Sequence, residues 1–454
     1  MADLSVDFAG IRSPNPFWLA SAPPTNSGDQ VQRAFDAGWG GAVWKTLGTP
    51  IVNVSSRLGG VGYGAQPLMG LNNIELITDR PLSVNLKEIA QTKKLYPDHA
   101  VVVSLMFNER SEWEDILKRC EDTGCDGVEL NFGCPHGMCE RGMGSAVGQE
   151  PKVLEELVRW VIGATSLPVI AKLTPNVTDV VDPGLAAVRG GAHAVSLINT
   201  VQSVIGVDLD RLVPLPRVGD ASSHGGYCGP AVKPIALRMV AQLAREREFG
   251  IPISGIGGIS DWRDAAEFIA LGAGTVQVCT AVMHHGFRIV DDMIEGLSDY
   301  LDSKGMGCVD DLVGAAIPGF REWGDLDLNY HVVAEIDEAT CIGCQVCHVA
   351  CHDAAHQCIH LPGVAAIPGH TAPMAARAAA QATSASPDAP YRVPWVDETE
   401  CVGCNLCALV CPVEGCISMV EKRRAPETET WNDRVAKGTD HVPGGLADLD
   451  PRRP

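Results

Sequence analysis

The segment "PISGIGGISDWRDAAEFIALGAGTVQVCTAVM", residues 252–283, contains the repeating unit from which the fold can be predicted. Two short apolar runs, 252–258 and 275–283, flank a segment whose apolar residues recur about every 3.6 positions and which ends at glycine. This order is typical of a strand, a helix and a second strand that lies parallel to the first.

The same alternation continues through residues 17–305. Eight repeats within about 300 residues favour a closed (β/α)8 TIM barrel of the α/β class over an open doubly wound sheet. Two long connections, 47–98 and 201–230, are expected over the barrel mouth, where barrel enzymes assemble their sites. The six further candidate strands are "FWLASAP" (17–23), "GAVWKT" (41–46), "AVVVSLMF" (100–107), "GVELNFG" (127–133), "PVIAKLT" (168–174) and "AVSLINT" (194–200).

The charge balance restricts the classes of partner. A formal net charge of -21 argues against binding to nucleic acid or to an anionic membrane surface, because few cations are present to neutralise phosphates. Residues 1–25 contain neither a basic segment nor an uninterrupted apolar run, so they do not resemble a signal peptide. No other run is typical of a membrane span. We therefore expect a cytoplasmic protein.

Cysteine is unevenly distributed, since ten of the 17 cysteines lie between residues 341 and 416. Two runs, "CIGCQVCHVAC" (341–351) and "CVGCNLCALVCP" (401–412), share the spacing C-x2-C-x2-C-x3-C, which predicts two [4Fe-4S] clusters. Zinc is the alternative, but two such runs exceed the four thiolates that a zinc knuckle needs. The fourth cysteine of each run is expected on the other cluster, which predicts the ligand sets Cys341, Cys344, Cys347 and Cys411, and Cys401, Cys404, Cys407 and Cys351, with Cys358 and Cys416 as buried thiols.

These patterns predict three parts of the chain. A barrel is expected over residues 1–330, and a ferredoxin-like domain with two [4Fe-4S] clusters over 331–420. Within the second domain, a segment at about 362–390 is dominated by Ala, Pro, Ser and Thr and is expected as an inserted linker. The charged segment 421–454 is expected as a disordered tail.

The two parts together imply a cofactor. Iron-sulfur clusters carry single electrons, whereas an organic substrate in a barrel usually gains or loses a hydride. A flavin converts between the two, and barrel enzymes hold its phosphate with glycine-rich loops after strands 7 and 8. "SGIGGIS" (254–260) and "QVCTAVM" (277–283) occupy those positions.

Several segments carry a family resemblance. "LASAPPT", "WKTLGTP", "NIELI", "ELNFGCPHGMCERGMG", "AKLTPNVTD", "INTV" and "QVCTA", followed by the two cysteine runs, resemble the FMN and iron-sulfur portion of dihydropyrimidine dehydrogenase, a relative of dihydroorotate dehydrogenase. The resemblance runs from about residue 3 to about residue 420. It implies a bacterial-type subunit whose partner oxidises NAD(P)H with FAD and further clusters, in a heterotetramer built on a homodimer. No dinucleotide-binding glycine motif was found in this chain, which agrees with such a partner.

The resemblance also implies residue roles. Lys172 would stabilise the reduced flavin, although it could instead pair with a strand-end carboxylate such as Glu129. Amides suit the alternating donors and acceptors of a pyrimidine, and Glu75 is a further candidate contact. The implied FMN contacts are Ser21, Lys45, Thr46, Lys172, Gly229, Gly257, Gly258, Cys279 and Thr280, and the implied pyrimidine contacts are Asn73, Asn131, Asn199 and Thr200.

Cys134 lies in the glycine-rich stretch "NFGCPHGMCERGMGSAVGQEP", 131–151. By the resemblance its thiol protonates C5 of the pyrimidine while C6 receives a hydride, on a loop that closes over the substrate. The alternative is a buried thiol that only packs. The stretch departs from the family at Gly133, where relatives carry serine, and at Cys139, which replaces a glycine and is expected as an inert thiol or as a partner of Cys134 in an oxidised form. His136 and Arg141 are candidates for tuning the charge of the loop.

Three main functions remain open from the sequence, beside a related reduction of another unsaturated nitrogen heterocycle. The first is reversible reduction of uracil or thymine, with electrons from NAD(P)H passing through the clusters to FMN. The second is oxidation of dihydroorotate, whose carboxylate asks for a further cation that the motifs do not identify. The third is an electron-transfer module in which the barrel is only a scaffold.

Overall fold

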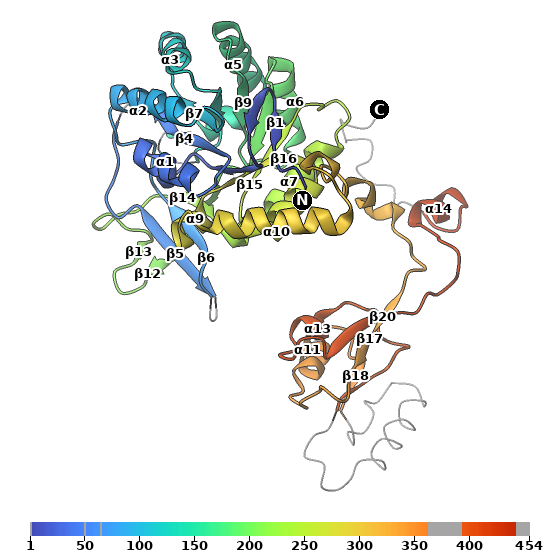
Figure 1. Cartoon of the computed structure of the whole chain (residues 1–454). Helices are drawn as coiled ribbons and strands as arrows, with labels where there is room; N and C mark the ends of the chain where they lie inside the picture. The colour runs from blue at the N-terminus through green and yellow to red at the C-terminus, as the bar shows by residue number, and fades with distance from the viewer. Residues whose placement is uncertain are drawn as a thin grey trace. The chain divides into compact units, whose positions relative to one another are not determined.

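Eight parallel strands close into a barrel, as the sequence predicts, and they follow one another around it in chain order (Figure 1). The computed structural model describes residues 2–49, 51–63, 66–135, 137, 139–361 and 393–441. The barrel strands are β3 (Phe17–Leu19), β4 (Gly41–Gly48), β7 (Ala100–Met106), β8 (Gly127–Asn131), β9 (Val169–Lys172), β10 (Ala194–Leu197), β15 (Ile253–Ile256) and β16 (Ala273–Val278).

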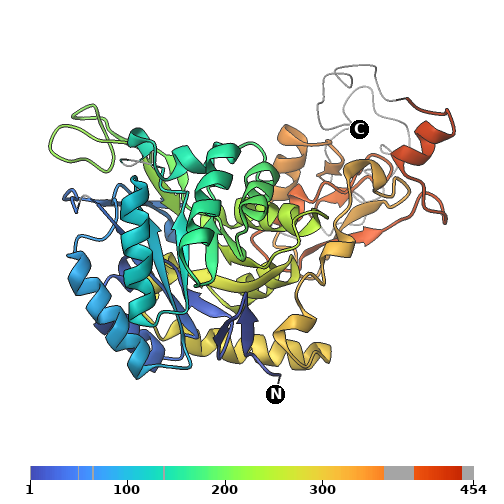
Figure 2. The ribbon, with the colours of Figure 1, turned by 90° about the horizontal axis from the view of Figure 1, so that it is seen from above.

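Helices surround the barrel and bury their apolar faces against it (Figure 2). Helix α8 shows the local cause, because the Asp261 side chain caps its first turn and Phe268 and Ile269 are fully buried on its inner face. The helices of this unit are α1 (Gly28–Asp36), α2 (Leu82–Leu95), α3 (Arg110–Thr123), α4 (Ser145–Gly148), α5 (Pro151–Ala164), α6 (Val181–Gly190), α7 (Lys233–Arg245), α8 (Trp262–Ala270), α9 (Thr280–His285) and α10 (Ile289–Lys304).

The two long connections pair with each other at the carboxyl ends of the barrel strands. One follows β4 and the other follows β10, and together they form an antiparallel sheet in the order β11-β14-β6-β5. We call this sheet the mouth sheet. Its strands are β5 (Leu58–Tyr63), β6 (Gln66–Asn73), β11 (Val201–Ser203) and β14 (Gly225–Cys228), and the hairpins β12 (Val207–Asp208) with β13 (Val213–Pro214) and β1 (Val6–Phe8) with β2 (Ile11–Ser13) lie outside it.

The chain divides into two compact units, Met1–Phe320 and Arg321–Pro454, whereas the expected boundary is residue 330. In the second unit, each cysteine run leads into a short helix, and the small core consists largely of cysteines. The unit contains α11 (Val346–Ala354), α13 (Leu406–Leu409) and two antiparallel pairs, β17 (Val332–Ile336) with β20 (Ile417–Glu421) and β18 (Ile359–His360) with β19 (Trp395–Val396).

The expected linker at about 362–390 lies outside the described residues. The expected tail is described as far as residue 441, and there it contains helix α14 (Trp431–Ala436). Thr430 and Asp433 form a reciprocal cap at the start of this helix, with N–H···O distances of 3.0 and 2.9 Å, which gives the local reason for its formation. In the described part of the chain, none of the helices is long and apolar enough to cross a membrane.

Candidate functional site

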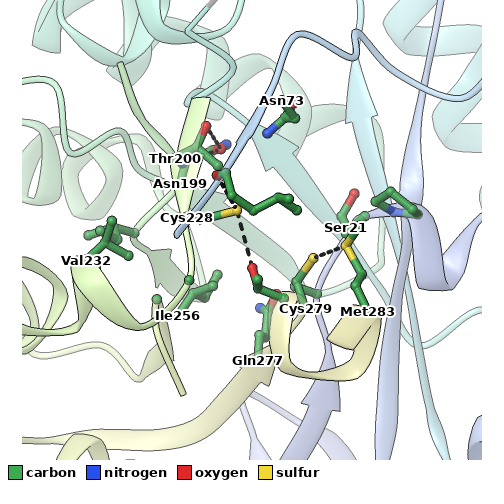
Figure 3. A pocket seen from close by; sticks show the side chains of 18 of the residues that line it. Ser21, Asn73, Asn199, Thr200, Cys228, Val232, Ile256, Gln277, Cys279 and Met283 are labelled. Carbon is green, nitrogen blue, oxygen red and sulfur yellow. Dashed lines mark hydrogen bonds between the residues drawn. The ribbon is translucent and has the colours of Figure 1, made fainter. Parts of the chain in front are cut away.

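A cavity lies at the carboxyl ends of the barrel strands, and residues of the mouth sheet also line it. Figure 3 shows side chains from its wall. The cavity encloses about 1140 Å³ of space between protein atoms, part of it open to solvent. The barrel brings the ends of all its strands together, so residues from distant parts of the chain meet here. All fourteen residues predicted for the flavin, the pyrimidine and proton transfer line it: Ser21, Lys45, Thr46, Asn73, Asn131, Cys134, Lys172, Asn199, Thr200, Gly229, Gly257, Gly258, Cys279 and Thr280.

Two buried lysines in the cavity wall are each paired with a carboxylate. Lys45 Nζ lies 2.6 Å from Glu75 Oε2, and Lys172 Nζ lies 3.3 Å from Glu129 Oε1. The ion pair between Lys172 and Glu129 is the alternative that the sequence left open for this lysine. Lys172 makes this ion pair and also lines the cavity. Pairing is the condition under which such charges are tolerated inside a protein.

Glu129 is fully buried and belongs to a polar network inside the barrel. Its Oε2 atom accepts hydrogen bonds from Ser196 Oγ at 2.8 Å and from Gln277 Nε2 at 3.1 Å. Gln277 Nε2 also lies 3.2 Å from Ser254 Oγ. The network satisfies a carboxylate that would otherwise be costly to bury, and it holds Lys172 at the cavity wall.

Amide and hydroxyl groups form a second chain of hydrogen bonds. Asn199 Nδ2 donates to Asn131 Oδ1 at 2.9 Å, and Asn131 Nδ2 donates to Thr46 Oγ1 at 3.1 Å. Thr46 Oγ1 also lies 3.1 Å from Ser21 Oγ. On the mouth sheet, Asn73 Nδ2 donates to the Gly226 carbonyl at 3.1 Å. These contacts hold donors and acceptors in fixed positions at the cavity surface, as recognition of a polar ring requires.

Glycines after β15 form a narrow backbone turn. Gly257 and Gly258 have φ values of +125° and +78°, which side-chain-bearing residues rarely adopt. A Cβ atom on Gly258 would lie 2.7 Å from Lys233 Cβ and 3.0 Å from the Gly229 carbonyl oxygen. The turn is thus shaped for a ligand to approach the backbone closely, at the place where barrel enzymes bind phosphate.

Cys134 follows β8 and lies in the cavity wall with only 6% of its surface exposed. It packs with Ile77, Met106 and Met143, and its carbonyl accepts a hydrogen bond from Ser145 N at 3.0 Å. The adjacent Pro135 carbonyl lies 3.0 Å from His224 Nε2. The backbone at Cys134 is therefore held by contacts on both sides.

The structure shows the surroundings of Gly133 and Cys139, the two positions at which the sequence departs from the family pattern. A Cβ atom at Gly133 would lie 2.3 Å from Asn199 Cβ, so glycine allows Asn199 to approach the loop. Cys139 accepts a hydrogen bond from Ser145 Oγ at 3.1 Å and is not among the residues that line the cavity. His136 and the Arg141 side chain lie outside the described parts of the structure.

The prediction from sequence missed several lining residues, notably Tyr227, Cys228 and Gln277. Thr280 Oγ1 donates to Cys228 Sγ at 3.2 Å, a contact drawn in Figure 3. Burial raises the pKa of the Cys228 thiol and raises that of Cys279 to about 12, so both thiols stay protonated near neutral pH. For Cys228, its place directly before Gly229 in the sequence is the signal that could have indicated it.

The second unit contains two voids, and each is surrounded by cysteines. Among the described residues, no three His, Cys, Asp or Glu side chains converge closely enough to hold a single metal ion. The thiols instead surround a space, which suits a larger inorganic group better than zinc. The four cysteines of each predicted ligand set line the same void, together with one further cysteine. One void is lined by Cys341, Cys344, Cys347, Cys411 and Cys416, and the other by Cys351, Cys358, Cys401, Cys404 and Cys407.

Comparisons with known proteins agree with both units. Residues 3–301 match the family model for dihydroorotate dehydrogenase, and residues 334–419 match a 4Fe-4S dicluster domain. The NAD-dependent dihydropyrimidine dehydrogenase subunit PreA of Escherichia coli K12 is 43% identical over 357 residues, which cover 78% of this chain and 87% of the relative.

Two further relatives come from a plant and an archaeon. The chloroplastic dihydropyrimidine dehydrogenase (NADP(+)) of Arabidopsis thaliana is 41% identical over 337 residues, which cover 71% of this chain and 79% of the relative. The catalytic subunit of dihydroorotate dehydrogenase B (NAD(+)) from Pyrococcus horikoshii is 38% identical over 316 residues, which cover 69% and 98% of the two chains. The relatives thus include enzymes named for each of the two pyrimidine reactions considered above.

Proposed function

This chain belongs to the dihydroorotate dehydrogenase family, and from that premise we propose that it reversibly reduces the C5–C6 double bond of uracil or thymine. It is an oxidoreductase with a 4Fe-4S dicluster domain. The observation that supports the proposal most strongly is the position of Cys134, which lines the same cavity as the two buried lysines and the four predicted pyrimidine contacts.

The cavity fits FMN, the cofactor of the family. The turn at Gly257 and Gly258 leaves no room for side chains and suits a phosphate, and Lys172 lies in the same wall and suits the electron-rich edge of the ring. When bound, FMN would supply a hydride to C6 of the pyrimidine. The other predicted FMN contacts are Ser21, Lys45, Thr46, Gly229, Cys279 and Thr280.

The chain's own residues would bind the pyrimidine and move the proton. Asn73, Asn131, Asn199 and Thr200 offer amide and hydroxyl groups for the carbonyl and N–H groups of the ring. The thiol of Cys134 would donate a proton to C5 during reduction, and its thiolate would accept that proton in the reverse reaction. Burial at the cavity wall excludes water from this step.

The charge balance of the cavity favours a neutral pyrimidine over dihydroorotate. Lys45 and Lys172 are already paired with Glu75 and Glu129. Among the described residues that line the cavity, these lysines are the only Lys or Arg side chains, so a substrate carboxylate would find no cation without a competing carboxylate. For this reason we propose uracil or thymine, and not dihydroorotate, as the substrate.

The relative from Escherichia coli is named as a subunit, so a partner chain exists in its system. For this chain the proposed partner is a flavoprotein with FAD and iron-sulfur clusters that oxidises NAD(P)H, in a cytoplasmic heterotetramer with a homodimeric core. The eight predicted cluster ligands, four at each void, would hold two [4Fe-4S] clusters, which would supply one-electron transfer between the partner and FMN.

The function is tested on the isolated FMN-loaded chain. The flavin is photoreduced without oxygen, and uracil, thymine or orotate is then added. We expect the flavin to be reoxidised by uracil or thymine, with formation of the 5,6-dihydropyrimidine, and to be unaffected by orotate. Reoxidation by orotate together with no response to uracil and thymine would support the dihydroorotate reaction instead, and no response to any of the three would support an electron-transfer module.

Removal of one predicted cluster ligand should halve the iron content. In Cys407→Ala, one void loses a thiol that its four-iron cluster needs, so iron per chain should fall by about half, with loss of NAD(P)H-driven turnover. The matched control is Cys358→Ala, which removes a thiol from the same void at a position outside the ligand spacing and should keep the iron. Iron analysis and electron paramagnetic resonance measure both variants. Equal iron in Cys407→Ala and the unchanged protein would contradict the assignment.

A further inference from the structure

Arg57 lies outside the cavity but contacts a carboxylate that lines it. Its Nη1 atom donates to Glu75 Oε1 at 2.8 Å, while the other oxygen, Oε2, lies 2.6 Å from Lys45 Nζ. Glu75 is a cavity-lining residue with 12% of its side chain exposed, and Arg57 is not a lining residue. The carboxylate is thus held between a cation in the cavity wall and a cation behind it.

Arg57 is itself fixed by its surroundings. Its Nε atom donates to the Val54 carbonyl at 2.7 Å, and Nη1 and Nη2 each lie 3.1 Å from Asp79 Oδ2. Asn26 Nδ2 donates to the other oxygen of Asp79 at 3.2 Å. Burial opposes ionisation of Asp79, but the hydrogen bonds from Asn26 and Arg57 outweigh it and lower the pKa of this carboxyl group. Four charged groups, Lys45, Glu75, Arg57 and Asp79, therefore alternate in sign from the cavity wall outward.

This order gives Arg57 a defined effect on Glu75. A carboxylate whose two oxygens are each held by a cation has a fixed orientation and accepts hydrogen bonds only. A pyrimidine presents N–H groups that such an acceptor can bind. If Arg57 were lost, Glu75 Oε1 would lose the cation that it now contacts, and the carboxylate could rotate away from the ring or turn toward solvent.

We infer that Arg57 is a positioning residue that sets the affinity for the pyrimidine through Glu75. The inference rests on the proposed function and deepens it, because it assigns a part in substrate binding to a residue that does not itself line the cavity. Arg57 immediately precedes β5, and Glu75 follows β6, so the two strands of one hairpin of the mouth sheet bring them together. The geometry of that hairpin, and not only the barrel strands, would then determine how well the ring is held.

The first test is steady-state kinetics of Arg57→Gln with uracil. A hydrogen bond to a charged group typically contributes a factor of about ten or more to binding, so KM should rise about tenfold. The value of kcat should stay within about twofold, because the proton donor and the flavin site are unchanged. Arg57→Lys keeps the charge but loses the fork that reaches both Glu75 and Asp79, so it should recover part of the affinity.

The matched control is Arg12→Gln, which removes an exposed arginine that pairs with Asp7 at 3.4 Å on the β1–β2 hairpin, and it should leave KM unchanged. Asp79→Asn provides an independent variant, since it removes the outer anchor of Arg57 and should raise KM in the same direction by a smaller factor. Flavin content and thermal midpoint show that each variant is folded.

A double-mutant cycle separates positioning from a general structural role. If Arg57 acts through Glu75, the variant Arg57→Gln/Glu75→Gln should have the same KM as Glu75→Gln alone. If the fold increases in KM of the two single variants multiply in the double variant, or if Arg57→Gln leaves KM unchanged, the inference is overturned. The proposed function is unaffected by either result. If the unsubstituted protein fails to turn over uracil or thymine, the proposed function fails first and the inference fails with it.

Discussion

Replacement of Cys134 by serine should lower the rate of uracil reduction at saturating substrate by a factor of about 10² to 10⁴, the usual contribution of a general acid. Serine has nearly the same shape, but an aliphatic hydroxyl is a far weaker acid than a thiol. The sulfur lies in the wall of the cavity that also contains Lys45 and Lys172. The substitution changes the proton donor and leaves the ion pairs of both lysines in place. Stopped-flow reoxidation of the reduced flavin by uracil measures the effect.

The control for this prediction is Cys139→Ser on the same loop. Cys139 does not line the cavity, and its thiol accepts a hydrogen bond from Ser145, a contact that a serine hydroxyl can keep. Its rate should therefore stay close to that of the unsubstituted protein. A rate for Cys134→Ser within about threefold of the control would be too small for loss of a general acid and would assign to Cys134 the packing role weighed at the outset.

The second large effect is expected from Lys172→Met. The substitution leaves the Glu129 carboxylate fully buried without its ion pair, which typically costs about 3–5 kcal/mol of stability. It also removes the cation predicted beside the flavin, so the purified variant should contain little FMN. Thermal unfolding and the absorbance of released flavin measure the two effects.

A double variant separates these two consequences. In Lys172→Met/Glu129→Gln, the buried charge is gone, so most of the lost stability should return, because removing both members of a buried pair is far less costly than removing one. The flavin content should stay low, since the cation is still absent. Lys87→Met, at an exposed position on α2, serves as the control and should change neither quantity. A Lys172→Met variant with full flavin content would contradict the predicted role of this lysine.

The sequence was most informative where the deciding pattern is local. The alternation of apolar runs and helical segments predicts all eight barrel strands, because the strand and helix periods are properties of adjacent residues. The spacing within each cysteine run is local in the same sense, and the structure places the four cysteines of each predicted set, with one further cysteine, around the same void. A local signal existed for α14, since Thr430 and Asp433 have the spacing of a helix cap, but the prediction of a tail considered only the charged composition.

Contacts across the barrel mouth could not be predicted from local patterns in the sequence. Nothing near Arg57 in the sequence indicates that its guanidinium reaches Glu75, or that Gly133 touches Asn199. These contacts depend on how the two long connections pair into the mouth sheet, and the pairing of irregular connections has no short-range signature. The lining residue Tyr227, on β14 of the mouth sheet, was missed for the same reason.

By itself, then, the sequence determined that this protein has a parallel barrel, a domain with two groups of cysteines, and a set of strand-end residues that must meet, because parallel strands in a barrel end at one face. Only the tertiary structure decided which carboxylate neutralises which lysine and which residues stand behind them. The physical reason is that buried charges are stabilised by partners brought close by folding, wherever in the chain those partners lie.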